Sequence, residues 1–518
     1  MRRTTFVHHH LARDSAHGAR FATRHSFGWV AASLVIVGLA FPALSNPAQS
    51  EPANRSDLAA LKSAVNAQVA AARQVAPAMG VHIVEAKSGR EVYGYNPATK
   101  RILASNTKLF TSAAALDVLG PGFFFETPLY LRGDTKDGVL HGDLAVVGGG
   151  DPNISGRHWH GDSFAVFRQW ARALRQRGVH RITGNVILAT GLFDLQLVHP
   201  DWPEDQLDRW YEAPVAALSF NDNCVLVKVE SLGAEARVSL VPELPIFAVQ
   251  DRVAVTSNRR QESVRIGRPT LEGDWQTLHT FEARGRIHRA TEFVDKWVTV
   301  ADPAAYFGTA LRQALWEEGI VTEGSVKEVK ALTGRAWDLV ATHRSDLLTT
   351  LEIVNKRSQN FYSEQVLKLL GAHHCRDGSW AGGVRAVRES LAALGLDPDA
   401  FDLADGSGMS RNNLATPRLV TDLLRRMGDH RWRSEFMSTL PYSGEPDLRW
   451  ERRLQKPPYR GNVLAKTGAL SGVSTLSGYA KGRSGTLYAF SILMNRTSAN
   501  WRAKNAQDAI LRALIDHG

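Results

Sequence analysis

The sequence predicts a mixed α/β (α+β) fold in which both ends of the chain build one domain around a large, mostly β insertion. Three observations support this prediction. The chain has 518 residues, enough for two or more domains. Its 44% hydrophobic and 22% charged residues are typical of a globular protein. Helical and strand-like patterns occur together near both ends, whereas short strand-like runs dominate the middle.

The first 45 residues are typical of an export signal. An apolar run, FGWVAASLVIVGLAFPALS, follows a region with one acid, Asp14, and five basic residues, namely Arg2, Arg3, Arg13, Arg20 and Arg24. A basic region, an apolar core and small residues near Ala43 indicate a signal peptide. The alternative is an N-terminal membrane anchor, because the run approaches spanning length. We expect an exported, periplasmic or cell-envelope protein, with possible membrane association through residues 1–45.

Charge and cysteine content limit the classes of partner and cross-link that we expect. Without residues 1–45 the net charge falls from +10 to about +6, which suits an anionic surface or polymer as well as an ordinary basic protein. No basic stripe with interleaved aromatic residues is found in the sequence, so we expect no nucleic-acid partner. The two cysteines, Cys224 and Cys375, do not make a disulfide framework, and whether they pair stays open.

Residues 57–125 are expected to form the first part of the terminal domain. Leu, Ala and Val have helical spacing over 57–74, and residues 79–97 predict two strands around a turn at Ser88-Gly89. A second helix opens at Ser105. It ends at Gly120-Pro121, because glycine caps a helix and proline cannot continue it.

Residues 126–345 are expected to form the inserted region, with a smaller domain nested at roughly 151–226. Strand-like runs such as GNVILAT and NCVLVKVE recur there, together with one helix, SFAVFRQWARALRQRG. Residues 346–518 return to the terminal domain. They show helical patterns, then three successive antiparallel strands between 462 and 495, and a final helix at 500–515.

Ser105 and Lys108 stand three residues apart at the start of the second helix, so their side chains share a face. A hydroxyl is a weak nucleophile until a base takes its proton, and a lysine can be that base when burial and neighbouring cations lower its pKa. S-x-x-K is a weak pattern, but this is its single occurrence in the chain.

Lys466-Thr467-Gly468 closes a predicted strand, where a lysine can hold a carboxylate and glycine lets a substrate backbone approach. Lys87-Ser88-Gly89 matches the same pattern but falls in a hairpin turn. For a proton relay, S-x-N occurs at four places, beginning at Ser219, Ser358, Ser410 and Ser498. Ser358 and Asn360 are favoured because they precede a helix and lie between the other two motifs.

The order S-x-x-K, S-x-N, K-T-G resembles the active-site set of the penicillin-recognising serine acyltransferases. Further stretches narrow the resemblance, namely GGGDPNIS at 148–155, YEAPVAALSFNDN at 211–223, NKRSQN at 355–360, ADGSGMSRNN at 404–413 and AKTGALSG at 465–472. They resemble the D-alanyl-D-alanine carboxypeptidase/endopeptidase family, the class C low-molecular-mass penicillin-binding proteins (peptidase family S13). The resemblance implies a transpeptidase/β-lactamase-like domain whose antiparallel sheet is covered by helices on both faces.

The resemblance also implies residue roles. Ser105 would attack the carbonyl between two D-alanines, Lys108 would be the general base, and Ser358 would relay the proton. Among the substrate-binding residues, Asn360 would hold the substrate and Lys108 in position. The terminal carboxylate would be received by Lys466, Thr467 and Gly468. The N–H groups of Ser105 and Ala469 would bind the oxyanion. Peptidoglycan peptides would be the substrates, β-lactams would acylate Ser105, and no cofactor or metal is needed.

Recognition of the substrate side chain is a further expectation of the resemblance. The guanidinium of Arg411 would meet the carboxylate of a diaminopimelate residue. Relatives often carry an aspartate where this chain has Ala189, so an amine contact is lost unless Asp194 replaces it.

Two alternative functions stay open from the sequence. A β-lactamase or esterase would differ in deacylation rate, and a non-catalytic wall-binding protein would not be acylated at all. The HWHGD stretch at 158–162 resembles a zinc-ligand run, but it has no second ligand cluster. Ser407 lacks the spacing of a nucleophile elbow, so its turn is expected to bind substrate. The balance of carboxypeptidase and endopeptidase activity is left undecided.

Overall fold

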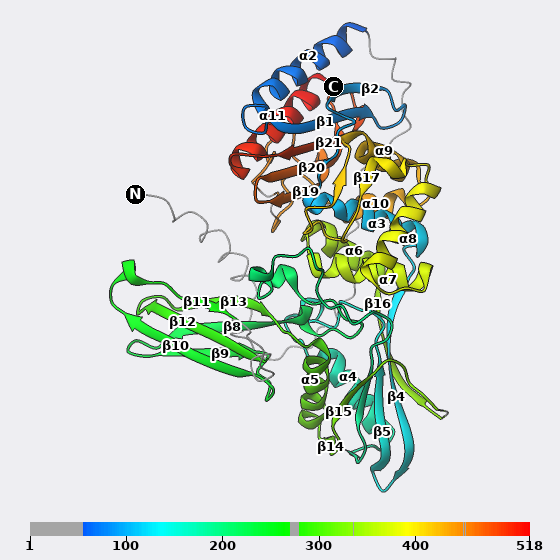
Figure 1. The fold of residues 1–518 in the computed structure, drawn as a ribbon, viewed down its shortest axis with the longest axis vertical. Coiled ribbons are helices and arrows are strands. Elements are labelled where there is room, and N and C mark those ends of the chain that lie inside the picture. Colours follow the sequence, from blue (N-terminus) through cyan, green and yellow to red (C-terminus); the bar gives the residue numbers. More distant parts are fainter. Residues whose placement is uncertain (1–54, 270–278, 335, 449, 451) are drawn as a thin grey trace, which may run out of the picture.

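The two ends of the chain share one antiparallel sheet (Figure 1). The computed structural model describes residues 55–269, 279–334, 336–448, 450 and 452–518, so the export signal predicted at residues 1–45 lies outside the described residues. In spatial order the five strands are β19 (Val463–Leu470), β20 (Val473–Lys481), β21 (Leu487–Asn495), β1 (Ala78–Glu85) and β2 (Glu91–Tyr95). The predicted hairpin and the three predicted C-terminal strands are confirmed, and Gly89 takes the positive φ of 74° that the hairpin turn needs.

Helices cover both faces of this sheet, as expected. On one face α2 (Arg55–Ala72) and α11 (Asn500–His517) pack apolar side chains such as Val65 and Leu514 onto the strands. The other face carries α9 (Pro417–Asp429), which begins with a proline after the cap Thr416. Behind it lies a helical layer of α3 (Thr107–Val118), α6 (Leu347–Lys356), α7 (Asn360–Cys375), α8 (Trp380–Ala393) and α10 (Arg433–Thr439). A small sheet of β17 (Phe401–Asp402), β18 (Leu414–Ala415) and β3 (Arg101–Ile102) joins this layer to the start of α3.

The inserted region leaves the helical layer through β4 and returns beside it through β16. Its main sheet has seven strands, which are β4 (Phe124–Lys136), β5 (Val139–Val147), β6 (Arg181–Ile182), β7 (Val186–Ala189), β14 (Val321–Thr322), β15 (Val326–Val329) and β16 (Asp338–Asp346). Two helices, α4 (Ala165–Gln176) and α5 (Pro303–Glu317), pack against it through one apolar core. The insertion bounds of 126–345 stay a prediction, but the pairing of β4 with β16 shows that the chain departs and re-enters at one point.

Within the insertion, residues 224–269 and 279–299 form what we call the nested unit, which projects sideways in Figure 1. It holds two three-stranded sheets, β13-β8-β9 and β10-β12-β11. The strands are β8 (Cys224–Ser231), β9 (Ala236–Val241), β10 (Ala248–Thr256), β11 (Arg265–Gly267), β12 (Thr280–His288) and β13 (Phe293–Thr299). The sequence placed a nested domain at roughly 151–226. The pairing does not support that range, because β6 and β7 within it belong to the main sheet.

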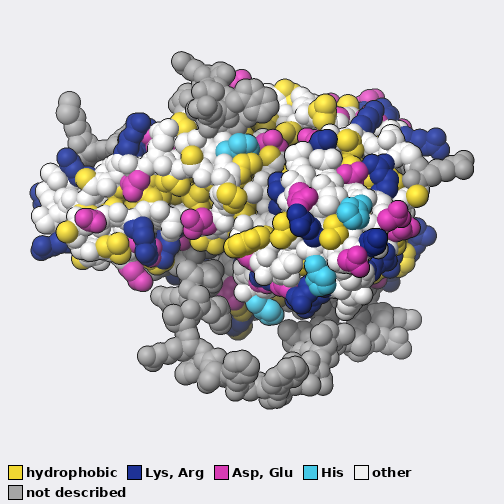
Figure 2. Space-filling view, turned by 90° about the horizontal axis from the view of Figure 1, so that it is seen from below, with side chains coloured by type: hydrophobic (Ala, Val, Ile, Leu, Met, Phe, Trp, Pro, Cys, Tyr) yellow, Lys and Arg dark blue, Asp and Glu magenta, His cyan; other side chains and the backbone are white. Residues whose placement is uncertain are grey.

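On one face of the molecule, charges of both signs are mixed. Seen from the inserted end, Figure 2 shows lysine and arginine side chains interspersed with aspartate and glutamate. This mixture does not produce the single-sign field of a nucleic-acid-binding face. Among the described residues, no helix combines the length and apolarity needed to cross a membrane.

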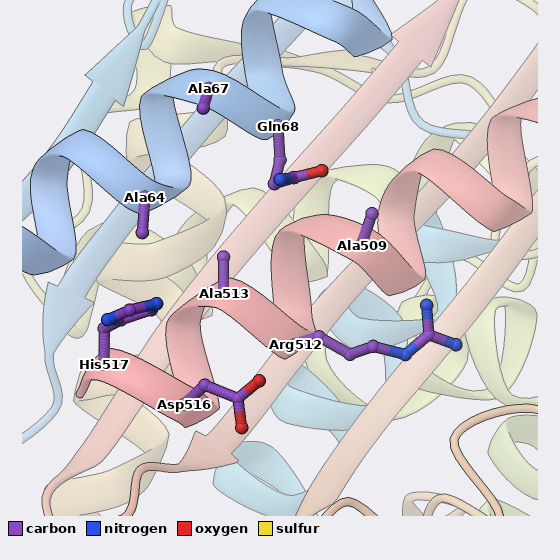
Figure 3. Close-up of a pocket in the computed structure, with 8 residues that line it drawn as sticks. All are labelled: Ala64, Ala67, Gln68, Ala509, Arg512, Ala513, Asp516 and His517. Carbon is purple, nitrogen blue, oxygen red and sulfur yellow. The ribbon is translucent and has the colours of Figure 1, made fainter.

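A groove of about 390 Å³ lies between the two terminal helices (Figure 3). Alanines of α2 and α11 form its floor, and Arg512, Asp516 and His517 lie along α11. None of the residues predicted to act on substrate lines this groove. Catalysis therefore has to be sought on the other side of the sheet.

Candidate active site

Ser105 lies in a short 3₁₀ helix, η1 (Ala104–Asn106), which leads directly into α3. The preceding Ala104 has a positive φ of 46°, a conformation that costs free energy in a residue with a Cβ and occurs often at active sites. Lys108 lies one turn further on, and its Nζ is 3.2 Å from Ser105 Oγ. The lysine is fully buried while the serine keeps some exposure. The expected serine–lysine pair is therefore present.

The amine of Lys108 is held by two further oxygen atoms. Its Nζ donates to Asn360 Oδ1 at 2.7 Å and to the carbonyl oxygen of Ser407 at 2.7 Å. A neutral amine has two N–H bonds and one lone pair. In a neutral amine these two acceptors could take both N–H bonds and leave the lone pair for the hydroxyl of Ser105, which is the geometry that a general base needs.

Ser358 and Lys466 form a second pair beside the first. Lys466 Nζ donates to Ser358 Oγ at 2.8 Å and to the carbonyl of Thr467 at 2.9 Å. Ser358 has a positive φ of 57° in the link between α6 and α7, and Asn360 begins α7. Because Ser358 and Asn360 are two residues apart, this link joins the two lysine-centred pairs. The site thus lies at the junction of α6 and α7.

Gly468 brings the K-T-G strand against Ser105. A Cβ added at Gly468 would lie 2.9 Å from the backbone nitrogen of Ser105 and 2.2 Å from Thr475 Oγ1. Thr475 in turn donates to the carbonyl of Leu103, which ties β20 to the start of η1. Only glycine permits this approach, so the edge of β19 lies directly beside the nucleophile. Ala469, the expected second oxyanion donor, is exposed at the end of this strand.

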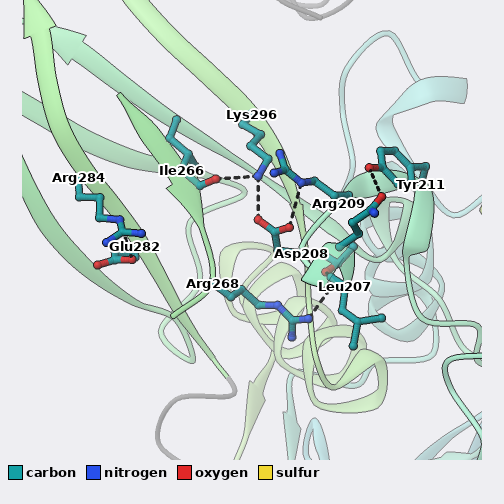
Figure 4. Close-up of polar contacts among 11 residues, drawn as sticks. Leu207, Asp208, Arg209, Tyr211, Ile266, Arg268, Glu282, Arg284 and Lys296 are labelled. Atoms are coloured by element: carbon teal, nitrogen blue, oxygen red, sulfur yellow. Dashed lines mark hydrogen bonds and ion pairs between the residues drawn. The ribbon is translucent and has the colours of Figure 1, made fainter. Parts of the chain in front are cut away.

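Asn360 is itself oriented from the inserted region. Its Nδ2 donates to the carbonyl of Tyr211 at 3.0 Å, and Tyr211 belongs to a loop, residues 203–212, that the nested unit braces (Figure 4). In that brace Lys296 Nζ donates to Asp208 Oδ2 at 2.7 Å, and Arg268 donates to the carbonyl of Leu207 at 3.0 Å. This contact could not be predicted from residue identity, because the atom that accepts from Asn360 is a backbone oxygen.

Ser407 contacts Lys108 through its backbone carbonyl and not through its hydroxyl. The N–H of Ser407 donates to the carboxyl of Glu364 on α7, which is fully buried. Burial and the negative charge of Asp405 raise the pKa of Glu364 to about 7, although hydrogen bonds from the turn act in the opposite direction. Glu364 and Asp405 were not expected from the sequence. The two glycines of ADGSGMSRNN were the available signal.

Arg411 is exposed, and its Nη1 donates to the carbonyl of Ser471, just after the K-T-G strand. Ala189 is buried in β7 and does not face solvent. Asp194 is engaged by Lys368, whose Nζ lies 2.6 Å from Asp194 Oδ1. The sequence did not predict a role for Asp201. Its carboxylate accepts from Asn412 Nδ2 at 2.9 Å and from Ser410 Oγ. These two donors are the residues on either side of Arg411 in the chain, so Asp201 lies near Arg411.

The decoy motifs lie elsewhere. Ser88 donates to Glu85 in an exposed turn. In HWHGD, His158 approaches the hydroxyl of Tyr362 at 3.4 Å while Asp162 pairs with Arg168. Among the residues that the structure describes, no group of three or more potential ligands could hold a metal. Both cysteines are free thiols.

Comparison with known proteins identifies a consistent set of relatives. The model of the D-Ala-D-Ala carboxypeptidase 3 (S13) family matches residues 61–515. A D-alanyl-D-alanine carboxypeptidase of Actinomadura sp. (strain R39) is 32% identical over 85% of this chain and 81% of its own length. D-alanyl-D-alanine carboxypeptidase DacB of Haemophilus influenzae is 26% identical over 77% of this chain and 82% of its own. The crystal structure of penicillin binding protein 4 (dacB) from Haemophilus influenzae superposes with a TM-score of 0.74 at 25% identity, covering 85% of this chain and 97% of that one.

Proposed function

The chain belongs to the D-Ala-D-Ala carboxypeptidase 3 (S13) family, and we propose that it cleaves peptidoglycan stem peptides or cross-links through an acyl-enzyme on Ser105. It is a serine hydrolase with the penicillin-binding fold that the sequence predicted. The observation that carries the proposed mechanism is the contact of Lys108 Nζ with Ser105 Oγ at 3.2 Å inside a buried polar cluster.

In the proposed acylation, Lys108 takes the proton of Ser105 while Oγ attacks the carbonyl carbon of the penultimate D-alanine. The backbone N–H groups of Ser105 and Ala469 are our candidates for the oxyanion hole, and one such donor typically contributes about 3 kcal/mol. Collapse of the tetrahedral intermediate breaks the peptide bond. The departing amine of D-alanine takes a proton through Ser358, and water then hydrolyses the ester.

The proposed carboxylate site uses Lys466, Thr467 and Gly468. The ammonium of Lys466 is buried and hydrogen-bonded to Ser358, so one cation would bind the terminal carboxylate and orient the relay. Asn360 would hold Lys108 and the substrate backbone in place. No metal or cofactor takes part in any step of this proposal.

Substrate side chains are proposed to meet the rim formed by Arg411 and Asp201. Arg411 offers a guanidinium for a carboxylate, as the sequence suggested, and Asp201 offers a carboxylate for an amine. Ala189 and Asp194 are not proposed for this role, because the first is buried and the second pairs with Lys368. The guanidinium of Arg411 and the carboxylate of Asp201 would together suit a zwitterionic diaminopimelate side chain.

We also propose that penicillins acylate Ser105, which the similarity to a penicillin binding protein supports. A β-lactamase would form the same adduct but release it rapidly. Export remains a proposal based on residues 1–45. Membrane association is proposed only as an alternative in which that segment is not cleaved.

Mass spectrometry of the purified chain with a β-lactam tests this proposal. We expect a covalent adduct on the native protein and none on Ser105→Ala. Muropeptides added to the same samples distinguish carboxypeptidase products, which lose one D-alanine, from the halves of cross-linked dimers. An adduct on Ser407, or none on a folded native protein, would refute the assignment.

A further inference from the structure

The segment Asp405–Ser410, which we call the 405–410 loop, is wedged between α7 and the Ser105 turn. A Cβ at Gly406 would lie 2.9 Å from both Leu367 Cβ and the carbonyl of Ser363 on α7. Gly408 has a φ of +88°, and a Cβ there would lie 1.9 Å from the carbonyl of Ala104. Two glycines therefore let one backbone touch the helix on one side and the nucleophile's turn on the other.

Two buried carboxyl groups hold this loop by its backbone donors. Glu364 accepts from the N–H of Ser407 at 2.7 Å, from the N–H of Gly406 at 2.9 Å and from Trp380 Nε1 at 2.9 Å. Asp405 accepts from the N–H of Gly408 at 2.7 Å and from that of Ser410 at 2.6 Å. Both carboxyl groups are fully buried. Because burying a carboxylate costs free energy, we infer that the position of this loop has a functional role.

The peptide between Ser407 and Gly408 connects this loop to the general base. Its carbonyl oxygen accepts from Lys108 Nζ at 2.7 Å, and its N–H donates to Asp405 Oδ1. A peptide group that is hydrogen-bonded at both ends is polarised, which strengthens both bonds in a low-dielectric interior. The direction of the Lys108 amine thus depends on a carbonyl whose own orientation is set by carboxylates.

We propose that Glu364 and Asp405 are positioning residues for the general base, because they fix the Ser407 carbonyl that aims the lone pair of Lys108 at Ser105. This inference rests on the proposed role of Lys108 and adds two residues that touch neither substrate nor Ser105. It also assigns the 405–410 loop to the base rather than to substrate binding.

The same carboxyl groups influence how readily the base loses its proton. The charged groups that interact with Glu364 are Asp405 on the loop and Lys368 one turn further along α7. Lys108 on α3 is linked to Glu364 through the backbone of Ser407. Removing a negative charge close to an amine destabilises its protonated form. Loss of either carboxylate should therefore let Lys108 become neutral at lower pH while its geometry is disturbed.

Acylation kinetics of the full chain with a fluorescent penicillin test the proposal. Glu364→Gln and Asp405→Asn keep the side-chain shape but place an amide N–H against backbone N–H donors. We expect the acylation rate at saturating penicillin to fall about tenfold or more. The acid limb of the pH–rate profile should move to lower pH, and the affinity of the initial non-covalent complex should change little.

Asp117→Asn is the matched control. It makes the same change in a carboxylate on α3 that accepts from Ser390 Oγ at 2.7 Å and does not contact the loop. Its acylation rate and pH profile should equal those of the native protein, with rates expressed per acylated site so that unfolded molecules do not count. A merely structural role for Glu364 would lower stability without moving the pH profile.

Folded Glu364→Gln and Asp405→Asn variants with the native rate and acid limb would overturn the proposal. If both variants fail to fold, Trp380→Phe decides, because it removes one hydrogen bond to Glu364 and leaves the charge. It should slow saturated acylation by a smaller factor, and an unchanged rate would reject the positioning role. Failure of the native protein to acylate would instead refute the function of Ser105.

Discussion

The catalytic half of the molecule and the nested unit treat charge in opposite ways. Among the described residues of the catalytic half, five lysine, aspartate and glutamate side chains are completely buried, namely Lys108, Glu364, Lys368, Asp405 and Lys466. In the described part of the nested unit every charged side chain keeps contact with solvent, and the buried polar side chains there are threonines. Apolar side chains are buried in both regions, so the difference lies in their polar residues.

Buried charged groups therefore mark the region of the fold in which we expect catalysis. Taking a charge out of water costs several kcal/mol unless it is paired, so a group of buried charges persists only where each has a partner and a task. An exposed ion pair such as that of Arg284 with Glu282 in Figure 4 contributes about 0–1 kcal/mol. If this interpretation is correct, changes in the catalytic half should affect rate more than stability, and changes around the nested unit should do the reverse.

The largest effect is expected from Lys108→Met. Removal of the base should slow acylation by about 10³-fold. The free energy of unfolding should change by less than about 2 kcal/mol, because relief of desolvation offsets two carbonyl acceptors left without a donor. Stopped-flow acylation and urea denaturation measure the two quantities. A loss of stability large enough to explain the lost activity would contradict the comparison.

Gly468→Ala should come next. The new Cβ would press on Thr475 and on the nitrogen of Ser105, so either β19 or the nucleophile must shift. A displacement of this size typically costs about 10²-fold in rate. The control is Gly122→Ala, where the added Cβ meets nothing within 4 Å. Native acylation by a folded Gly468→Ala variant would show that the strand does not set the position of Ser105.

Asp208→Ala tests the other side of the comparison. It leaves Lys296, which lies 2.7 Å from Asp208 Oδ2, without its carboxylate, and should lower the free energy of unfolding by about 1–3 kcal/mol. Acylation should fall by less than about tenfold, through the loop that carries Tyr211. Arg284→Ala, which loses a 3.6 Å ion pair in the same view, should change stability by at most about 0.5 kcal/mol. A rate loss for Asp208→Ala as large as that for Gly468→Ala would break the comparison.

The smallest effect concerns Glu212, next to Tyr211. Its carboxyl is buried, and neither of its oxygen atoms has a hydrogen-bond partner among the described residues. Burial, together with the charges of Asp205 and Asp208, raises the pKa of Glu212 to about 8. Since the folded pKa exceeds the usual value of 4.5, the folded state loses stability as pH rises from about 4.5 to 8. Glu212→Gln should raise Tm relative to the native protein at pH 8 and not at pH 4.5, as scanning calorimetry can show. Equal differences at both pH values would contradict it.

Some of the site was readable in the sequence because it is local. The spacing of Ser105 and Lys108 follows from helical geometry over three residues, and the strand bearing Lys466 follows from its alternating pattern and closing glycine. The order of the motifs then led to the family. By contrast, S-x-N matched four positions equally well, and only its place between the other motifs favoured Ser358.

Residue type and short-range periodicity were therefore sufficient to predict the terminal helices and strands, the serine–lysine pair and the family. Tertiary structure alone decided that the carbonyl oxygens of Ser407 and Tyr211 complete the cluster, since a backbone atom leaves no trace in residue identity. It also decided that Glu364 lies beneath the 405–410 loop and that Asp194 is taken by Lys368. Contacts between residues tens or hundreds of positions apart depend on how helices and sheets pack, and local propensity does not encode that packing.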